Sequence, residues 1–211
     1  MVLCKSKDLP RRKPSQHRGK EKVEIILESA KSLIGDRGND AVSMREIAAH
    51  AGISPSSIYQ YFPDKNAILS ALINEYFEQI HHMITTLIES VSNLDSIGEH
   101  IANGMDQFIE IFRKEPALAT IWAGVQANPV LRNLDAEDSA KNAALLTEAL
   151  THLAPGINKA EAFNANLLLM HTASTTARLA LNVGKSEGDA LLSELRTLTK
   201  LRIEALLQNS I

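Results

Sequence analysis

Small hydroxyl side chains are concentrated in one short stretch of the sequence, and longer polar side chains follow directly. The stretch contains Ser54, Ser56 and Ser57, and then Tyr59, Gln60, Tyr61 and Lys65. Hydroxyl, amide and ammonium groups donate hydrogen bonds to phosphate oxygens, and small side chains let a helix approach the floor of a groove closely. The stretch is therefore a candidate surface for binding a nucleic acid.

The sequence contains no constellation that is typical of catalysis or of a bound metal. None of its seven histidines has the spacing of a zinc site such as HExxH, and the single cysteine, Cys4, excludes a cysteine-rich site. No GxSxG elbow, Walker A loop or GxGxxG loop occurs. We therefore expect a protein that is not an enzyme and that uses no metal and no cofactor.

Charge is distributed unevenly along the 211 residues, of which 45% are hydrophobic. Residues 1–70 carry 12 Lys and Arg against 8 Asp and Glu, whereas residues 71–211 carry 10 against 17, and the whole chain has a net charge of −3. A basic end on an acidic body suggests that this end alone contacts a polyanion. Residues 1–19 form a basic arm, in which Arg11, Arg12 and Arg18 are candidates for insertion into a DNA minor groove. A solubilising tail is the alternative.

The location follows from what the sequence lacks. No run of about 18 apolar residues predicts a membrane-spanning helix. The basic start of the chain has no apolar stretch of the kind found in secretory signals, and one cysteine fits a reducing compartment. We expect a cytoplasmic protein without a membrane partner.

The elements that would position the polar stretch are helices, because apolar residues recur at intervals of three and four from Lys20 onward. Ser43 and Glu46 have the spacing of a capping box, and Ser54 followed by Pro55 is typical of another helix start. The predicted helices are residues 20–37, 44–51, 55–61, 64–90, 97–114, 116–126, 136–153, 159–183 and 188–208. The fold class is therefore all-α, with about nine helices.

Two of the short predicted helices form a predicted helix-turn-helix. Ala48 is small enough for close packing, and Gly52 can take the left-handed conformation in the turn. Ile47, Ile53 and Ile58 would fill the angle between the helices. A glycine turn alone also occurs in structural helix hairpins, so the polar residues around it carry the argument.

These residues give the chain its resemblance to a known family. The sequence reads VSMREIA at 42–48, AGIS at 51–54 and IYQYFPDK at 58–65. With the helix before them, these stretches resemble the DNA-binding domain of the tetracycline-repressor (TetR) family of bacterial transcription regulators, over about residues 20–72. The resemblance implies that the helix starting at Pro55 enters the major groove.

The resemblance also implies roles for single residues. Ser43, Arg45, Tyr59, Tyr61 and Lys65 would contact phosphates, and bases or the adjacent backbone would be approached by Ser54, Ser56, Ser57 and Gln60. A glycine is common in the family where this chain has Ser57, which leaves base preference open. Tyr59 has core packing as its alternative role, and we expect Phe62 to pack against the long helix that follows.

The two last predicted helices carry apolar and small residues that favour a homodimer. The candidate interface residues are Leu167, Ala173, Ala177, Leu181, Leu191, Leu195, Leu198, Arg202 and Leu206. Two such helices can form a four-helix bundle with their two-fold copies, as TetR-like proteins do. The alternative is that both stripes face the subunit's own core.

Methionines and aromatic residues in the middle of the chain suit a cavity for a small apolar effector, which the resemblance places in this region. The candidate lining residues are Met83, Leu87, Met105, Phe108, Ile109, Phe112, Trp122, Gln126, Met170 and His171. Asp106, Glu110, Gln126 or His171 would supply a polar anchor. Ordinary core packing is the alternative for each residue.

The sequence thus predicts three parts: a basic arm (1–19), a helix-turn-helix domain (20–66) and an effector-binding and dimerisation domain (67–211). The expected function is a repressor that binds double-stranded, palindromic operator DNA as a dimer and is released by a small molecule. A helical ligand-binding or interaction module that never binds DNA is the alternative. The operator, the effector and the sign of regulation stay open.

Overall fold

The computed structural model describes residues 14–91 and 97–208, and over these residues the chain is helical with no strand. The helices are α1 (Pro14–Arg37), α2 (Met44–His50), α3 (Pro55–Ile58), α4 (Lys65–Ser90), α5 (Ile97–Lys114), α6 (Ala117–Ala127), α7 (Pro129–Leu153), α8 (Lys159–Asn182) and α9 (Lys185–Gln208). The predicted all-α class with nine helices is confirmed for the described part of the chain.

Two helices begin six or seven residues before their predicted starts. α1 begins at Pro14 and not at residue 20, so Arg18 lies in this helix, while Arg11 and Arg12 lie outside the described residues. α7 begins at Pro129 and not at residue 136. Asn128 Oδ1 accepts hydrogen bonds from the amides of Val130 (2.9 Å) and Leu131 (3.2 Å). Proline suits this first helical position because its missing N–H would have no partner there.

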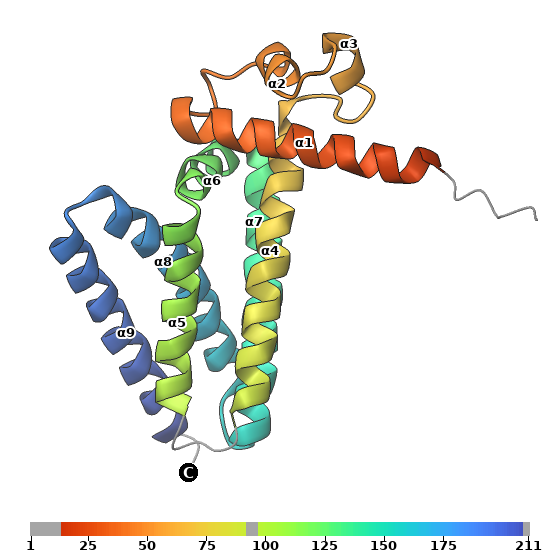
Figure 1. Cartoon of the computed structure of the whole chain (residues 1–211). Helices are drawn as coiled ribbons and strands as arrows, with labels where there is room; N and C mark the ends of the chain where they lie inside the picture. The colour runs from red at the N-terminus through yellow and green to blue at the C-terminus, as the bar shows by residue number, and fades with distance from the viewer. Residues whose placement is uncertain (1–13, 92–96, 209–211) are drawn as a thin grey trace, which may run out of the picture.

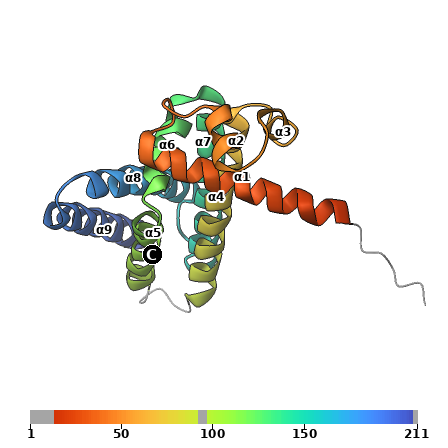
Figure 2. The ribbon, with the colours of Figure 1, turned by 45° about the horizontal axis from the view of Figure 1, so that its top comes forward.

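The nine helices form an upright body with a small group of helices across one end (Figure 1). α4, α5 and α7 run lengthwise, α8 packs between α7 and α9, and α1 crosses the upper end with α2 and α3 above it. Figure 2 shows α8 and α9 together on one side, while α2 and α3 lie at the end and the start of α1 projects away from the body. The predicted helix-turn-helix therefore lies apart from the predicted dimer helices.

One main core joins the small end to the body. It contains Ile26 and Ile34 of α1, Ile47 of α2 and Ile58 of α3, all 0% exposed, together with residues of α4 and α6. α1 and α6 approach closely at Gly35, where an added Cβ would lie 2.6 Å from the Cβ of Ala117. The small end is therefore packed firmly onto the body.

An ion pair adds to the contact between α1 and the body. Lys31 Nζ lies 2.7 Å from Glu28 Oε1 and 3.1 Å from Glu115 Oε2. Burial lowers the pKa of Lys31, but hydrogen bonds to the two carboxylates outweigh it, so the net pKa is raised. Lys31 is therefore charged and links α1 to the loop before α6.

The described residues include neither a membrane-spanning helix nor a cluster of metal ligands. No helix in residues 14–91 and 97–208 has the length and apolar character needed to span a membrane. Within the same ranges, no three histidine, cysteine or acidic side chains are grouped so that they could hold a metal ion.

Candidate nucleic-acid interface and ligand cavity

The start of α2 is fixed by the predicted capping box. Ser43 Oγ accepts a hydrogen bond from the Glu46 amide (3.3 Å), and Glu46 Oε2 accepts from the Ser43 amide (2.9 Å) and hydroxyl (2.7 Å). Arg37 Nη2 donates to Glu46 Oε1 (2.7 Å) and to the carbonyl of Ala41 (2.9 Å). The bonds from Ser43 and Arg37 lower the pKa of Glu46 to about 2. Ser43 and Arg45 are exposed beside this network.

The turn between α2 and α3 has the predicted glycine geometry. Gly52 has φ +66°, a left-handed conformation that is strained for any residue with a side chain. After this turn, the amide of Ile53 donates to the carbonyl of Ala48 (3.0 Å). Ile47, Ala48 and Ile58 are completely buried between the helices. The turn therefore holds α3 at a fixed angle to α2.

The start of α3 is a cluster of three hydroxyls. Ser54 caps the helix by accepting from the Ser57 amide (3.1 Å), and its Oγ lies 3.0 Å from Ser56 Oγ and 2.7 Å from Ser57 Oγ. Ser54, Pro55 and Ser56 are exposed, and Ser57 is half-buried. The hydroxyl rotors can turn from one another toward an incoming acceptor, so this edge can donate to phosphate or to base edges.

The polar residues after α3 divide into exposed and anchored ones. Tyr59 is 52% exposed and Gln60 is exposed, whereas Tyr61 is half-buried against the main core. α3 itself ends at Ile58, so these residues lie in the turn after it and not in the helix expected to reach residue 61. Phe62 is 8% exposed and belongs to the core, as expected.

Lys65 has a structural role that the sequence did not indicate. Its Nζ donates to the carbonyls of Asn39 (2.5 Å) and Val42 (2.9 Å), and the side chain is half-buried. The lysine therefore ties the start of α4 to the loop between α1 and α2. One of its three N–H groups remains for another acceptor.

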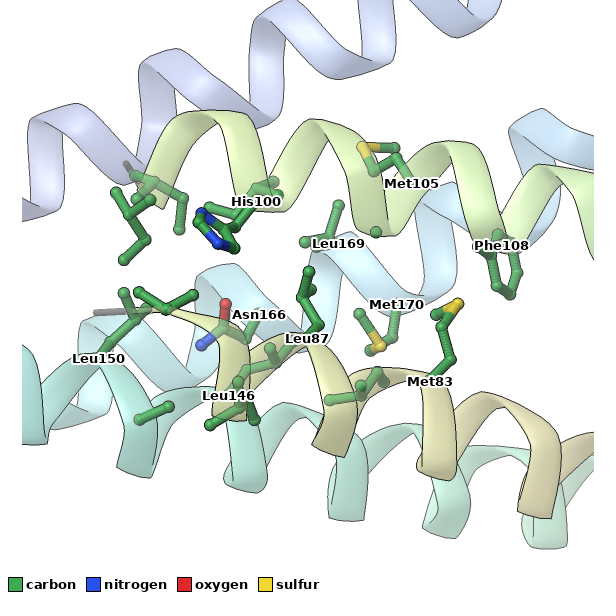
Figure 3. Close-up of a pocket in the computed structure, with 18 of the residues that line it drawn as sticks. Met83, Leu87, His100, Met105, Phe108, Leu146, Leu150, Asn166, Leu169 and Met170 are labelled. Carbon is green, nitrogen blue, oxygen red and sulfur yellow. The ribbon is translucent and has the colours of Figure 1, made fainter. Parts of the chain in front are cut away.

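An apolar cavity of about 180 Å³ lies in the body between α4, α5, α7 and α8 (Figure 3). Five of the ten predicted effector residues line it: Met83, Leu87, Met105, Phe108 and Met170. Among the described residues that line it, His100, His152 and Asn166 alone carry a polar side chain.

The other five predicted effector residues do not line this cavity. Phe112 and Trp122 are buried in the main core, with their ring centroids 5.6 Å apart, and Ile109 packs with Ala180 and Leu192. No open space surrounds Phe112 and Trp122 among the described residues, because α6 packs closely on α4 and α7.

The proposed polar anchors lie elsewhere as well. Gln126 Nε2 donates to Asp135 Oδ2 (2.6 Å), and His171 is exposed. Asp106 pairs with Arg196 on the surface, and Glu110 Oε1 lies 4.0 Å from Lys114 Nζ. The polar groups of the cavity are therefore different from those expected.

The predicted dimer stripe is mostly an inner stripe. Ala173, Ala177, Leu195 and Leu206 are buried in the subunit itself, Leu167 and Leu191 are half-buried, and Arg202 pairs with Glu161 (2.6 Å). For the four buried residues the alternative of own-core packing holds, because α8 and α9 pack against α5 and α7. Of the predicted residues only Leu181 and Leu198 are exposed leucines, at 38% and 62%.

A second set of leucines is exposed on the same two helices. Leu168 (64%) and Leu179 (48%) lie on α8, and Leu201 (57%) lies on α9 near Leu198. We define the outer leucine face as Leu168, Leu179, Leu198 and Leu201. Leu181 follows Leu179 by two residues, or about 200° around α8, and therefore points to another side of the helix. The spacing of Leu198 and Leu201 is helical, so the sequence held a signal for a second stripe, but burial had to decide which stripe faces solvent.

Comparison with known proteins covers both parts of the chain. The family model described as "Bacterial regulatory proteins, tetR family" matches residues 26–72, and the model "Tetracyclin repressor-like, C-terminal domain" matches residues 95–207.

Relatives with names include the transcriptional regulator EthR of Mycobacterium tuberculosis, which is 31% identical over 124 residues (58% of this chain, 56% of EthR). The nucleoid occlusion factor SlmA of Pasteurella multocida is 28% identical over 113 residues, which are 53% of this chain and 55% of SlmA. The matched part of this chain thus spans about half the length of these relatives.

Solved structures share the fold over nearly the whole chain. A TetR-family regulator from Streptomyces coelicolor superimposes with a TM-score of 0.66 at 21% identity, covering 88% of this chain and 99% of that one. A TetR regulator from Haloarcula marismortui gives a TM-score of 0.69 at 14% identity, covering 90% and 100%.

Proposed function

This chain belongs to the TetR family of bacterial regulatory proteins, and we propose that it is a transcriptional regulator that binds operator DNA as a homodimer. The observation that carries the proposal is the exposed edge of α3, where Ser54, Pro55 and Ser56 project from a helix-turn-helix whose apolar side is buried. A major groove admits one α-helix, and this edge carries no bulky side chain that would hold the helix away from the bases.

The DNA contacts divide by position. Phosphates would accept hydrogen bonds from Ser43 and Arg45 at the start of α2. They would also accept from Tyr59, Tyr61 and the remaining N–H of Lys65. Ser54, Ser56, Ser57 and Gln60 would reach bases or the adjacent backbone. The basic residues Arg11, Arg12 and Arg18 would enter the neighbouring minor groove.

A dimer is supported by the outer leucine face. Four exposed leucines on two adjacent helices are unusual for a surface that stays in water, and a two-fold copy would cover them with the same face. The two copies of α3, related by a two-fold axis, would fit a palindromic operator whose half-sites lie about 34–36 Å, or a multiple of that distance, apart.

Effector control is supported by the cavity and by α4. This helix begins at Lys65, which holds the α1–α2 loop, and its far end contributes Leu87 and Ile88 to the cavity wall. A ligand that favours one position of α4 would change the distance between the two copies of α3 in the dimer. A repressor would thereby be released from DNA in the cytoplasm.

The test begins with DNA sequences selected by the purified full-length protein, whose binding is then measured by fluorescence anisotropy at several salt concentrations. We expect affinity to fall steeply as salt rises, since phosphate contacts release counterions. Arg45→Ala should lower the salt slope by about two, one for each subunit. Lys185→Ala, which removes an exposed charge at the start of α9, is the matched control and should leave the slope unchanged. Failure to select any DNA would favour the helical binding module.

A further inference from the structure

The cavity between α4, α5, α7 and α8 differs in character from one end to the other. In Figure 3 Met83, Met105, Met170 and Phe108 gather toward one end, and Asn166 and His100 lie toward the other. None of the described residues that line it is an aspartate, glutamate, lysine or arginine. His100 and His152 are the titratable side chains among the described lining residues, and an anion would have to gain more from them than the several kcal/mol that it loses in hydration. The chemistry of the wall therefore selects an uncharged ligand.

Asn166 presents a fixed hydrogen-bond acceptor to this cavity. The residue is 2% exposed, and its Nδ2 donates to Thr147 Oγ1 (3.0 Å). Thr147 Oγ1 donates its only proton to the carbonyl of Ala143 (2.7 Å), so it can only accept from Asn166. The amide orientation is thereby fixed, with Oδ1 on the opposite side.

The Asn166 oxygen is the acceptor that this side chain offers to the cavity. It is directed into the space between the labelled side chains of Figure 3. Removing water from a carbonyl oxygen costs free energy, and a ligand that fills the cavity recovers that cost only if it donates a hydrogen bond to the oxygen. An acceptor-only ligand would leave the cost in place.

We propose that the cavity binds a small, uncharged, mainly apolar molecule that donates one hydroxyl or N–H group to Asn166 Oδ1. This inference rests on the proposed effector function and specifies its ligand class. The volume of about 180 Å³ suits one aromatic ring with a short substituent, since a cavity of about 150 Å³ holds benzene. The flexible methionines at the other end adapt to the shape of the apolar body.

Gly104 shapes the same space. An added Cβ at this position would lie 2.7 Å from Leu87 Cδ2, so the absent side chain leaves room for Leu87 between α5 and α4. Gly104→Ala would displace Leu87 and change the shape of the cavity without touching Asn166. The variant therefore separates shape from hydrogen bonding.

The experiment measures ligand binding to the full-length protein by titration calorimetry in the absence of DNA. The probes are 4-ethylphenol, its methyl ether 4-ethylanisole, which cannot donate, and 4-ethylbenzoate, which is charged. We expect 4-ethylphenol to bind about tenfold more tightly than the ether, which corresponds to about 1.4 kcal/mol. 4-Ethylbenzoate should not bind.

Asn166→Leu should remove the tenfold preference for the phenol and leave ether binding unchanged. Asn164→Leu, the same substitution at an exposed position of α8, is the matched control and should keep the preference. Gly104→Ala should weaken phenol and ether to the same degree. The preference of the unaltered protein keeps the test valid if Asn166→Leu does not fold.

Equal binding of phenol and ether, preference for the benzoate, or binding of none of the three would overturn the proposal. Operator binding is measured separately, by the salt-dependent anisotropy experiment. A protein that fails with these ligands and still binds its operator has lost the ligand inference only, whereas failure to bind DNA overturns the regulator function.

Discussion

The N-terminal region (residues 20–66) and the C-terminal region (residues 97–208) use their apolar residues differently. In the N-terminal region Ile26, Ile34, Ile47 and Ile58 all enter one core with no exposure. In the C-terminal region many apolar residues belong to smaller clusters. Others line a cavity, and those of the outer leucine face are exposed to water. Unfilled volume and exposed leucines cost stability, so their concentration in one region indicates where the molecule meets a ligand and a second subunit.

The largest effect is expected when a charge is placed on the inner side of α9, and a charge on the outer side of the same helix is the comparison. Leu195 is 9% exposed and packs with Met105 and Ala173, whereas Leu198 is 62% exposed. Leu195→Glu buries an unpaired carboxylate and should lower the free energy of unfolding by at least about 4 kcal/mol. Leu198→Glu should change it by less than about 0.5 kcal/mol.

The same pair tests the dimer. Sedimentation of Leu198→Glu should give folded monomers at concentrations where the unaltered protein is dimeric, because two carboxylates would face each other across the two-fold axis. Denaturant unfolding followed by circular dichroism gives the stability of both variants. A fully dimeric Leu198→Glu protein would show that the outer leucine face lies outside the interface.

The next effect compares equal truncations in the two regions. Ile58→Ala removes a side chain that is 0% exposed and should lower the free energy of unfolding by about 3–4 kcal/mol. Ile101→Ala removes a half-buried side chain that already borders the cavity, and we expect about 1–2 kcal/mol. Urea unfolding of both variants measures the difference. Equal losses would mean that the cavity wall is packed as tightly as the core under α3.

The smallest effects concern two carboxyls with opposite responses to pH. Burial raises the pKa of Asp138 from 3.8 to about 6; Lys141 and His81 act against this, and Asp135 and Glu78 add to it. The native state then holds a proton that the unfolded chain releases, so stability falls as the pH rises from about 4 to about 6. Asp138→Asn should remove that fall and raise stability at pH 7 by about 1 kcal/mol, less than the full shift because the side chain is partly exposed.

Glu46 should show the reverse. Its pKa is lowered to about 2 by Ser43 and Arg37, so its contribution is complete above about pH 4.5 and is lost as the pH falls toward 2. Glu46→Gln should therefore flatten the acid limb of the stability profile, and Asp36→Asn, at an exposed site on α1, should leave both limbs unchanged. An unaltered acid limb in Glu46→Gln would contradict the role given to the capping box.

The motifs that could be predicted from sequence are those closed by near neighbours. Ser43 with Glu46, Ser54 with Ser57, and Gly52 all form bonds or turns within a few residues, so the local sequence contains both partners. The start of α7 lies seven residues before the predicted one. A proline is typical of a break between helices, but Pro129 occupies the first helical position after the Asn128 cap.

The sequence alone determined the helical class, the helix-turn-helix and the exposed serine edge, because spacing along one chain governs helices and caps. Only the tertiary structure decided which stripe of α8 and α9 faces solvent and where Lys65 donates. It also decided that Asn166, His100 and His152, and not Gln126 or His171, are the polar residues of the cavity wall. Each of these depends on contacts between residues that are distant in the chain. An amphipathic pattern predicts that one face of a helix will be buried. The packing of the other helices determines which part of the molecule, or which partner, covers that face.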